Sequence, residues 1–404
     1  MRTVLVVGAS LAGLSAARAL RARGFDGRLV VVGEEPHRPY DRPPLSKEFL
    51  AGRAEEPALV LEADGEDLGA EWLLGARAVA LAPGARGVRL ADGRSVTADG
   101  VVIATGAAAR TLPGAAAGSG VHTLRTLDDA RALRADLARG GRLVVIGGGF
   151  IGAEVASTAY ALGLDVTVVE AAPTPLSGPL GETMGGVVSG LHADHGVRLL
   201  CGTGVRGTET DGGGRVAAVV LADGRRLPAD TVVAGIGARP CVDWLAGSGI
   251  RLGDGVLCGA DGRTSLPGVV AVGDCAAWYD PAAGAHHRVE HWTAALERPA
   301  TAVAALLQGG PGGAGGVGGP GGPGGSGGQR APRPPYFWSD QYGVRIQFTG
   351  RAAGADSVTV EEGAPEGRDV LAVYRRGGVP VAVLGMNRPR SFTRWRKRLA
   401  ALTS

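Results

Sequence analysis

The stretch LVVIGGGFIGAE, residues 143–154, joins an apolar run to a complete Gly147-x-Gly149-x-x-Gly152 motif. Its β-branched and leucine residues are typical of a buried parallel strand, and AEVASTAYALG, residues 153–163, is expected to continue as a helix. A tight turn between such a strand and helix directs backbone N–H groups and the helix N-terminus toward a pyrophosphate. The stretch therefore predicts a dinucleotide-binding βαβ unit.

The next strand indicates which dinucleotide this unit binds. DVTVVE, residues 165–170, ends in Glu170. A carboxylate there can bind the 2′- and 3′-hydroxyls of the adenosine ribose, and it repels a 2′-phosphate. We therefore predict that the unit binds NADH in preference to NADPH.

A weaker copy of the motif begins the chain. The apolar run Val4–Val7 leads into GASLAG, residues 8–13, in which Ser10 replaces the middle glycine. Gly8 allows the turn, Gly13 lets helix and strand pack closely, and Glu34, at the end of the second strand, can bind ribose hydroxyls. Alone, this pattern also fits an ordinary βαβ turn with a surface acid.

The similarity between the two copies extends beyond the motifs. DGRSVTADGVVIATGA, residues 92–107, aligns without a gap to DGRRLPADTVVAGIGA, residues 223–238. Each reads as an Asp-Gly hairpin followed by a buried strand and a glycine turn. A further buried strand, GVVAVGDCA at 268–276, ends in Gly273-Asp274. We predict an α/β fold with two nested Rossmann-like domains.

Composition narrows the class of protein. The chain has 404 residues and a net charge of +3, so no polyanion-binding character is evident and no nucleic-acid partner is expected. Four scattered cysteines without a CxxC pair indicate a reducing compartment, small buried thiols and no metal site. The N-terminus resembles a signal peptide, but its strand is needed as a partner for the strand in RLVVVGEE, 28–35. We expect a cytoplasmic protein without a membrane span.

These motifs together resemble the glutathione-reductase superfamily of FAD/NAD(P)H flavoproteins. Within it, YDRPPLSK (40–47), VEHW (289–292) and FWSDQYGVRIQ (337–347) are similar to putidaredoxin-reductase-type ferredoxin reductases. The resemblance covers nearly the whole chain. It implies FAD and NADH as cofactors and an iron–sulfur ferredoxin as partner, serving a haem-thiolate monooxygenase or a ring-hydroxylating dioxygenase.

The resemblance also implies which residues form the sites. The FAD site would comprise the first glycine motif and the ends of the neighbouring segments: Gly8, Ser10, Ala12, Gly13, Glu34, Glu35, Arg42, Lys47, Ala104, Thr105, Gly106, Arg125, Gly273, Asp274, Glu290, His291 and Trp292. The NADH site would comprise the second motif and its neighbours: Gly147, Gly149, Phe150, Ile151, Gly152, Glu154, Glu170 and Gly237. The catalytic residues would be Lys47, Glu154 and Trp338, with Trp338 near the nicotinamide and the flavin. One departure is Thr174, where relatives often carry a basic residue that helps bind the adenosine end.

Lys47 is unusual in this composition, because it and Lys397 are the only lysines beside 40 arginines. A hydride arriving at flavin N5 leaves an anionic ring, which a nearby cation stabilises. A compact ammonium fits beside a flat ring better than a forked guanidinium does. We expect Glu154 to pair with Lys47 and offset its burial, and Pro43 and Pro44 to stiffen the loop. The alternative is a surface lysine that caps a helix.

A missing residue type suggests where electrons leave. Disulfide reductases of the superfamily carry a CxxxxC pair near the flavin, and peroxide-reducing members carry a single cysteine. Residues 33–60 contain no cysteine. We therefore predict an NADH:ferredoxin oxidoreductase that passes single electrons to an outside acceptor. The alternatives are an NADH oxidase, which the missing cysteine disfavours, and an NADH-responsive redox-sensing flavoprotein.

The predicted domains are an FAD-binding domain (1–107 and 239–308), an NADH-binding domain (108–238) and a C-terminal reductase domain of α+β type (329–404). Residues 309–328 form a glycine-rich linker, either a functional tether or an inert insertion. Residues 386–404 read as a basic helix, with Arg388, Arg390, Arg394, Arg396, Lys397 and Arg398. It would either attract an acidic ferredoxin or be a solvated face.

Overall fold

The computed structural model describes residues 1–82, 84, 86–113, 120–281, 283–309 and 334–402. The chain divides into two compact units. Unit 1 comprises Met1–Asp41, Val60–Ala108 and Arg239–Gln329, and unit 2 comprises Arg42–Leu59, Ala109–Ala238 and Arg330–Ser404. The chain therefore passes between the units several times, including at the strands β8 (Ala107–Ala109) and β17 (Ala238–Pro240).

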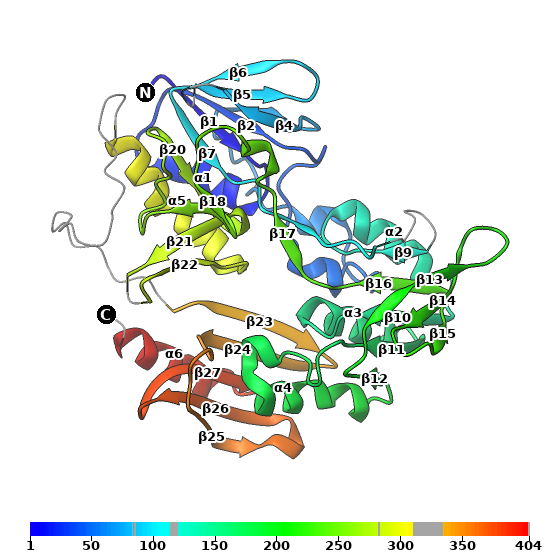
Figure 1. Cartoon of the computed structure of the whole chain (residues 1–404). Helices are drawn as coiled ribbons and strands as arrows, with labels where there is room; N and C mark the ends of the chain where they lie inside the picture. The colour runs from blue at the N-terminus through cyan, green and yellow to red at the C-terminus, as the bar shows by residue number, and fades with distance from the viewer. Residues whose placement is uncertain (83, 85, 114–119, 282, 310–333, 403–404) are drawn as a thin grey trace. The chain divides into compact units, whose positions relative to one another are not determined.

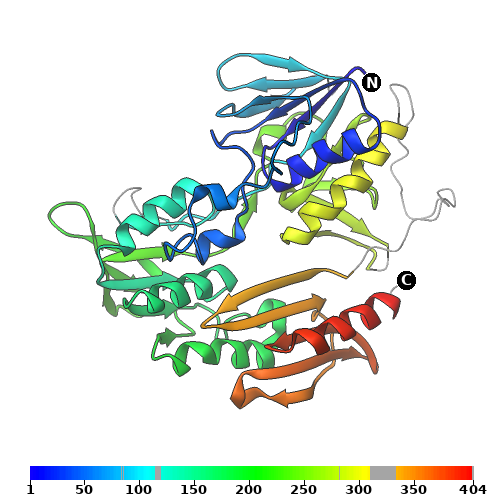
Figure 2. The ribbon, with the colours of Figure 1, turned by 180° about the vertical axis from the view of Figure 1, so that it is seen from behind.

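Unit 1 is built on a five-stranded parallel sheet, coloured mainly blue and cyan in Figure 1. Its order is β20 (Val269–Ala271), β7 (Gly100–Ile103), β1 (Thr3–Val7), β2 (Arg28–Val32) and β3 (Ala70–Leu73). The strands are short apolar runs, as expected for a sheet buried on both faces. The helices α1 (Leu11–Ala22) and α5 (Trp292–Gln308) lie side by side, as the reverse view shows (Figure 2).

Two smaller sheets complete unit 1. One is antiparallel and consists of β4 (Ala78–Leu81), β5 (Gly87–Leu90) and β6 (Ser95–Thr97). The other is mixed and consists of β18 (Leu252–Gly253), β19 (Gly255–Cys258), β21 (Ala276–Asp280) and β22 (Ala285–Arg288). Single-turn helices lie at η4 (Asp243–Leu245) and η5 (Gly273–Cys275).

Unit 2 contains a second five-stranded parallel sheet of the same design. Its order is β12 (Arg198–Leu200), β11 (Asp165–Val169), β10 (Arg142–Ile146), β16 (Thr231–Ala234) and β9 (Val121–His122). Its helices are α2 (Leu127–Leu137), α3 (Phe150–Ala161) and α4 (Ser177–Asp194), with η1 (Pro43–Ser46) and η2 (Glu56–Leu59). An antiparallel sheet of β13 (Val205–Thr210), β14 (Val216–Leu221) and β15 (Arg226–Pro228) follows β12.

The predicted repeat is confirmed by matching backbone contacts. Gly8 N–H donates to the carbonyl of Val32 at 2.7 Å, and Gly147 N–H donates to that of Val169 at 2.8 Å. The hairpins also correspond, because Asp92 Oδ1 and Asp223 Oδ1 each accept the backbone N–H two residues later at 3.0 Å. The same local sequence thus produces the same turn in both units.

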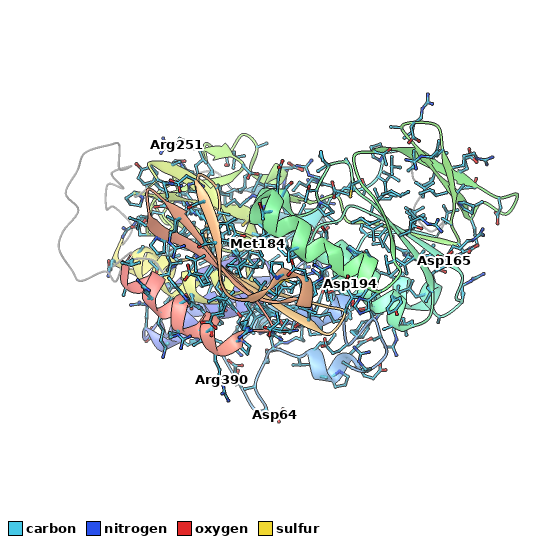
Figure 3. All side chains as sticks on the ribbon, turned by 90° about the horizontal axis from the view of Figure 1, so that it is seen from below. Asp64, Asp165, Met184, Asp194, Arg251 and Arg390 are labelled. Atoms are coloured by element: carbon cyan, nitrogen blue, oxygen red, sulfur yellow. The ribbon has the colours of Figure 1, made fainter. Side chains whose placement is uncertain are left out.

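The last part of unit 2 is a five-stranded antiparallel sheet. Its order is β23 (Tyr336–Gln341), β24 (Val344–Gly350), β27 (Val379–Met386), β26 (Asp369–Arg376) and β25 (Ser357–Ala364), with η6 (Pro365–Gly367) before β26. Side chains alternate between the two faces, as the strand period requires. Val370, Ala372 and Tyr374 pack with α4, whereas Leu371 and Val373 pack with Phe392 of α6 (Pro389–Leu402). Figure 3 shows Met184 on α4 beside this sheet.

The two units differ from the three predicted domains, because unit 2 combines the predicted NADH-binding and C-terminal domains and also includes the segment 42–59. Residues 42–59 lie within the predicted FAD-binding domain but belong to unit 2. The three-domain division stays a prediction. The predicted linker, 309–328, lies outside the described residues except for Gly309.

The cysteines are only partly as predicted. All four are free thiols, and Cys258 and Cys275 are buried. Burial raises the pKa of Cys275 to about 11, as expected for an inert thiol. Cys201, by contrast, is exposed, because it follows β12 at the edge of its sheet. The prediction of buried thiols was therefore wrong for this residue.

No helix in the described part of the chain has the length and apolar character needed to cross a membrane.

Candidate functional site

The carboxyl ends of the parallel strands in unit 1 bring many predicted site residues to one edge of the sheet. Gly8 follows β1, Ala104 follows β7 and Gly273 follows β20, and these three strands are neighbours. A Cβ on Gly8 would lie 2.1 Å from the carbonyl oxygen of Ala104, and one on Gly273 would lie 2.9 Å from the Cβ of Ala12. We call this row of residues the first edge. Ligands of open α/β sheets bind outside such edges.

Unit 2 has a corresponding second edge. Gly147 follows β10, Glu170 follows β11 and the turn with Gly237 follows β16. A Cβ on Gly147 would lie 2.3 Å from the carbonyl oxygen of Gly235, and one on Gly152 would lie 2.1 Å from that of Gly147. The outer two glycines of the motif are therefore required by packing between strand, turn and helix.

The middle position of each motif has a different requirement. A Cβ on Gly149 would meet nothing within 4 Å, and Ser10 occupies the equivalent place in unit 1 with extended backbone. The side chain of Ser10 does not cap α1, and Gly149 has no side chain with which to cap α3. The space beside Gly149 is therefore open, and this cradle lies at the N-terminus of α3, which suits a pyrophosphate. The residues present fit a dinucleotide.

Glu170 is held in place by the loop it accompanies. Its Oε2 accepts the backbone N–H of Gly148 at 2.8 Å, and its Oε1 accepts that of Ala172 at 2.8 Å. Each oxygen keeps a lone pair for a further donor. The carboxylate is therefore fixed at the end of β11, where the sequence places it.

The residues that follow β2 in unit 1 differ from those that follow β11 in unit 2. Gly33 is the first residue after β2, and a Cβ there would lie 2.5 Å from the Cβ of Ala9. Glu34 was predicted to end the second strand, but β2 ends at Val32, so Glu34 lies two residues beyond it. Its side chain is 68% exposed. Glu35, next in the chain, accepts a hydrogen bond from the Tyr40 hydroxyl.

The residues before and at the start of α5 also lie near the first edge. Arg288 donates from Nη1 to the carbonyl of Asp274 at 3.3 Å and also pairs with Glu290. His291 precedes the helix, and burial lowers its pKa to about 4, so its imidazole is neutral at physiological pH. Trp292 donates its indole N–H to Asp41 Oδ1 at 2.8 Å. Asp41 was not predicted, although it belongs to the quoted YDRPPLSK segment.

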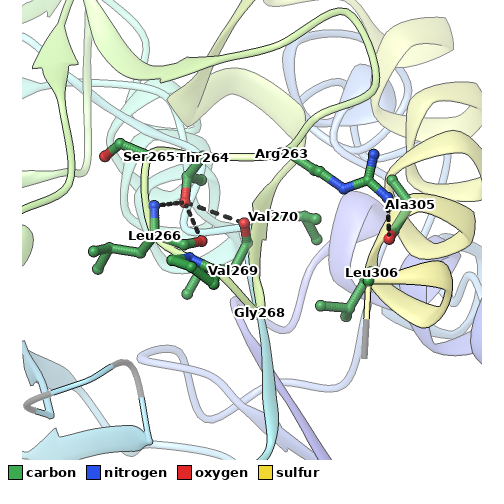
Figure 4. Close-up of a pocket in the computed structure, with 11 residues that line it drawn as sticks. Arg263, Thr264, Ser265, Leu266, Gly268, Val269, Val270, Ala305 and Leu306 are labelled. Atoms are coloured by element: carbon green, nitrogen blue, oxygen red, sulfur yellow. Dashed lines mark hydrogen bonds between the residues drawn. The ribbon is translucent and has the colours of Figure 1, made fainter. Parts of the chain in front are cut away.

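A small cavity beside α5 is too small for a dinucleotide. It has a volume of about 40 Å³ and is lined by residues such as Arg263, Thr264, Val269 and Leu306 (Figure 4). The Thr264 hydroxyl bonds the carbonyl of Val269 within it. Such a volume suits about one water molecule.

Lys47 and Glu154 form a buried ion pair in unit 2, as predicted. Lys47 Nζ donates to Glu154 Oε2 at 2.8 Å, and the side chains are 11% and 4% exposed. Lys47 directly follows η1, which contains Pro43 and Pro44, and its N–H bonds the Pro44 carbonyl. The surface-lysine alternative is excluded by this burial.

Three uncharged side chains that were not predicted as site residues complete this cluster. Ser46 Oγ donates to Glu154 Oε2 at 2.5 Å, and Ser339 Oγ donates to Oε1 at 2.7 Å. Gln341 Nε2 in turn donates to Ser339 Oγ at 3.0 Å. Ser339 and Gln341 are two residues apart on β23 and therefore lie on the same face of the strand. That spacing was the only feature of the sequence that could have indicated that they belong to one site.

The third predicted catalytic residue is not part of this cluster. Trp338 lies between Phe337 and Ser339 on β23, so its side chain is on the other face of the strand. There it stacks with Tyr336, with ring centroids 6.0 Å apart. Phe337 lies on the same face of β23 as Ser339, and its ring contacts that of Phe150 at the start of α3, with ring centroids 4.6 Å apart. Ile151, beside Phe150, is exposed.

The remaining predicted residues occupy turns next to these elements. Arg42 donates to the carbonyl of Arg125, and Arg125 N–H bonds Asp129 Oδ2 at 2.9 Å in the capping box of α2. Gly237 accepts the N–H of Arg110 at 2.9 Å with a φ of 95°. In unit 1, Thr105 Oγ1 donates to the Cys241 carbonyl at 2.7 Å, which fixes the turn through Gly106.

Comparisons with known proteins agree with this architecture. The family model described as "Pyridine nucleotide-disulphide oxidoreductase" matches residues 2–308, and the one described as "Reductase C-terminal" matches residues 336–404. The ferredoxin reductase component of a chlorobenzene dioxygenase from Cupriavidus sp. (strain PS12) is 39% identical over 392 residues, which cover 96% of this chain and 90% of that protein.

Two further comparisons concern putidaredoxin reductase. The enzyme of that name from Pseudomonas putida is 36% identical over 400 residues, which cover 96% of this chain and 89% of the relative. The crystal structure of a covalent putidaredoxin reductase–putidaredoxin complex matches with a TM-score of 0.89 and 33% identity, covering 99% of this chain and 93% of the matched chain. The chain therefore belongs to the pyridine nucleotide-disulphide oxidoreductase family.

Proposed function

We propose that this protein is an FAD-dependent NADH:ferredoxin oxidoreductase that supplies electrons to an oxygenase system. The first edge binds FAD and the second edge binds NADH. Bound there, FAD would supply the conversion between the two-electron chemistry of NADH and the single-electron chemistry of a ferredoxin. Relatives named as ferredoxin reductase components of dioxygenase systems, and a relative captured with putidaredoxin, support an iron–sulfur ferredoxin as the acceptor.

The observation that carries this proposal is the buried Lys47–Glu154 pair. Taking an ammonium out of water costs several kcal/mol, and a paired carboxylate offsets only part of that cost. A fold has no packing reason to retain such a charge where an apolar residue would serve. A fixed cation does have a use beside a ring that becomes anionic on reduction, because it stabilises the negative charge without reorganising.

NADH is proposed as the electron donor on the basis of Glu170. Its two oxygens are fixed by the backbone N–H groups of Gly148 and Ala172. A fixed carboxylate can accept hydrogen bonds from ribose hydroxyls but would repel a 2′-phosphate. The space over Gly149 leaves room for the pyrophosphate.

Electrons are proposed to leave the flavin for the ferredoxin without a thiol relay. Residues 33–60 contain no cysteine, and the described residues contain only free thiols. The cytoplasm, which keeps thiols reduced, is the proposed location.

The proposed docking charge for an acidic ferredoxin is on α6. Arg390 and Lys397 are exposed, and Arg390 projects from the start of the helix (Figure 3). Arg388 and Arg394 instead pair with Asp369 and Glu362 of the neighbouring strands. Opposite charges accelerate encounter, and salt screens them. Ferredoxin reduction should therefore slow with ionic strength, less so in Arg390→Gln/Lys397→Gln, while electron transfer to ferricyanide hardly changes.

Stopped-flow spectroscopy tests the function directly. The FAD-loaded protein should lose its yellow absorbance on mixing with NADH, and cytochrome c reduction should then require an added [2Fe–2S] ferredoxin. Slow bleaching with a long-lived charge-transfer complex and no ferredoxin-dependent turnover would instead identify a redox sensor. Rapid NADH consumption coupled only to oxygen would identify an oxidase.

A further inference from the structure

The carboxylate of Glu154 is held from both sides. Oε2 accepts hydrogen bonds from Ser46 and Lys47, which lie on the 42–59 segment. Oε1 accepts its bond from Ser339, which lies on the C-terminal sheet. Glu154 is 3% exposed and Ser339 is 0% exposed, so water does not replace these donors.

The direction of the Ser339 hydrogen bond is set by Gln341. The amide Nε2 of Gln341 can only donate, and it lies 3.0 Å from Ser339 Oγ. Ser339 therefore accepts from Gln341 and directs its own proton to Glu154 Oε1. A chain of this kind favours a carboxylate that acts purely as an acceptor, which is also what Lys47 requires.

The hairpin that carries these residues is fixed at its tip. Tyr342 and Gly343 connect β23 to β24 with φ values of 52° and 76°, a left-handed turn that is unfavourable for tyrosine. The Tyr342 N–H donates to Ser157 Oγ of α3 at 2.7 Å. Its hydroxyl lies 2.7 Å from His192 Nδ1, and its ring stacks on His195 at 4.5 Å. These contacts hold the strained turn, and with it β23, against α3 and α4.

We propose that Ser339 is a positioning residue for the Lys47–Glu154 pair, and that Gln341 orients it. The C-terminal sheet thereby determines where the ammonium is held during flavin reduction. This inference rests on the proposed function and adds the C-terminal sheet to the segments that hold the ammonium of Lys47.

The principal variant is Ser339→Ala, compared in FAD-loaded protein with the control Thr349→Val. Thr349 is a fully buried residue on the adjacent strand β24 of the same sheet, and its hydroxyl has no hydrogen-bond partner among the described residues. Both variants delete a buried hydroxyl, but only Ser339→Ala deletes a bond to Glu154. The limiting rate of flavin bleaching per bound flavin should fall about tenfold in Ser339→Ala, the effect of losing roughly one charge-assisted hydrogen bond.

The same experiment separates positioning from a general loss of structure. The NADH concentration for half-maximal rate should stay within about twofold, because NADH contacts are not altered and a tenfold change would require about 1.4 kcal/mol. In a Lys47→Met background, Ser339→Ala should add little to the loss, since the ammonium it positions is absent. Gln341→Met should reduce the rate less than Ser339→Ala does.

A measurement without NADH keeps the inference independent of the proposed function. Photochemical titration of the bound flavin should give a more negative midpoint potential in Ser339→Ala than in Thr349→Val. Equal potentials and equal bleaching rates in these two variants would overturn the inference, as would an undiminished Ser339→Ala effect in the Lys47→Met background. Failure of the parent protein to bleach with NADH would instead refute the proposed function, and the potentials would still decide the positioning role.

Discussion

Replacing Lys47 by methionine should lower stability and flavin reduction together, whereas replacing both members of the pair should restore only stability. In the parent, Nζ lies 2.8 Å from Glu154 Oε2, and both side chains are largely removed from solvent. Lys47→Met leaves a buried carboxylate with the hydroxyls of Ser46 and Ser339 as its remaining donors. Breaking a buried pair in this way typically costs about 3–5 kcal/mol.

The magnitude converts into a measurable change of melting temperature. For a unit of the size of unit 2, each kcal/mol shifts Tm by roughly 2–4 °C. A loss of about 3 kcal/mol should therefore lower the Tm of the FAD-loaded protein by roughly 6–12 °C. Circular dichroism follows this transition, and flavin fluorescence reports release of the cofactor.

The double variant Lys47→Met/Glu154→Leu should recover most of the lost Tm, because a buried ion pair can be replaced by apolar residues at little net cost. Its flavin should still be reduced slowly by NADH, since the cation is missing. A Tm unchanged in Lys47→Met, or lower in the double variant than in the single one, would refute the assignment of a buried charge pair. Parental bleaching rates in both variants would refute its role in hydride transfer.

Three further predictions concern the second glycine motif, Glu170 and His192. Gly149→Ala should keep the parental Tm but raise the KM for NADH about tenfold, because its Cβ occupies the open cradle. Gly152→Ala should lower the stability measured in a thermal melt by about 1–3 kcal/mol, because its Cβ would lie 2.1 Å from the carbonyl oxygen of Gly147. Equal Tm values for these two variants would contradict this. Glu170→Ala should narrow the preference for NADH over NADPH by about tenfold in kcat/KM, and equal values for the two in the parent would disprove its role. Burial, with a smaller effect of His195, lowers the pKa of His192 from 6.5 to about 4, so between these pH values the unfolded chain takes up a proton that the folded chain does not. Tm should therefore fall as the pH is lowered from 6.5 to 4, by the equivalent of up to about 3 kcal/mol. If His192→Gln kept the same dependence of Tm on pH as the parent, this prediction would be wrong.

The sequence alone determined the paired architecture of this protein, because that architecture rests on local rules. A short apolar strand, a glycine turn and a helix encode one βαβ unit, and the repeated order identifies two of them. Gly147 and Gly152 occur where packing excludes a Cβ. Lys47 could be singled out because its residue type is rare in this chain, and its pairing with Glu154 was predicted from the family resemblance.

Only the tertiary structure decided which uncharged groups surround that pair. Ser339 contacts Glu154 across 185 residues of sequence, and serine and glutamine occur too widely for their spacing to reveal a partner. The same applies to Cys201, whose exposure depends on β12 being the edge strand. In unit 1, Ala9 and Gly33 occupy the positions that correspond to Gly148 and Glu170 of unit 2, and they pack against each other. The carboxylate of unit 1, Glu34, therefore lies one residue further from the end of its strand. A motif specifies backbone geometry within one turn, but the side chains at a buried site are set by which segments the fold brings together.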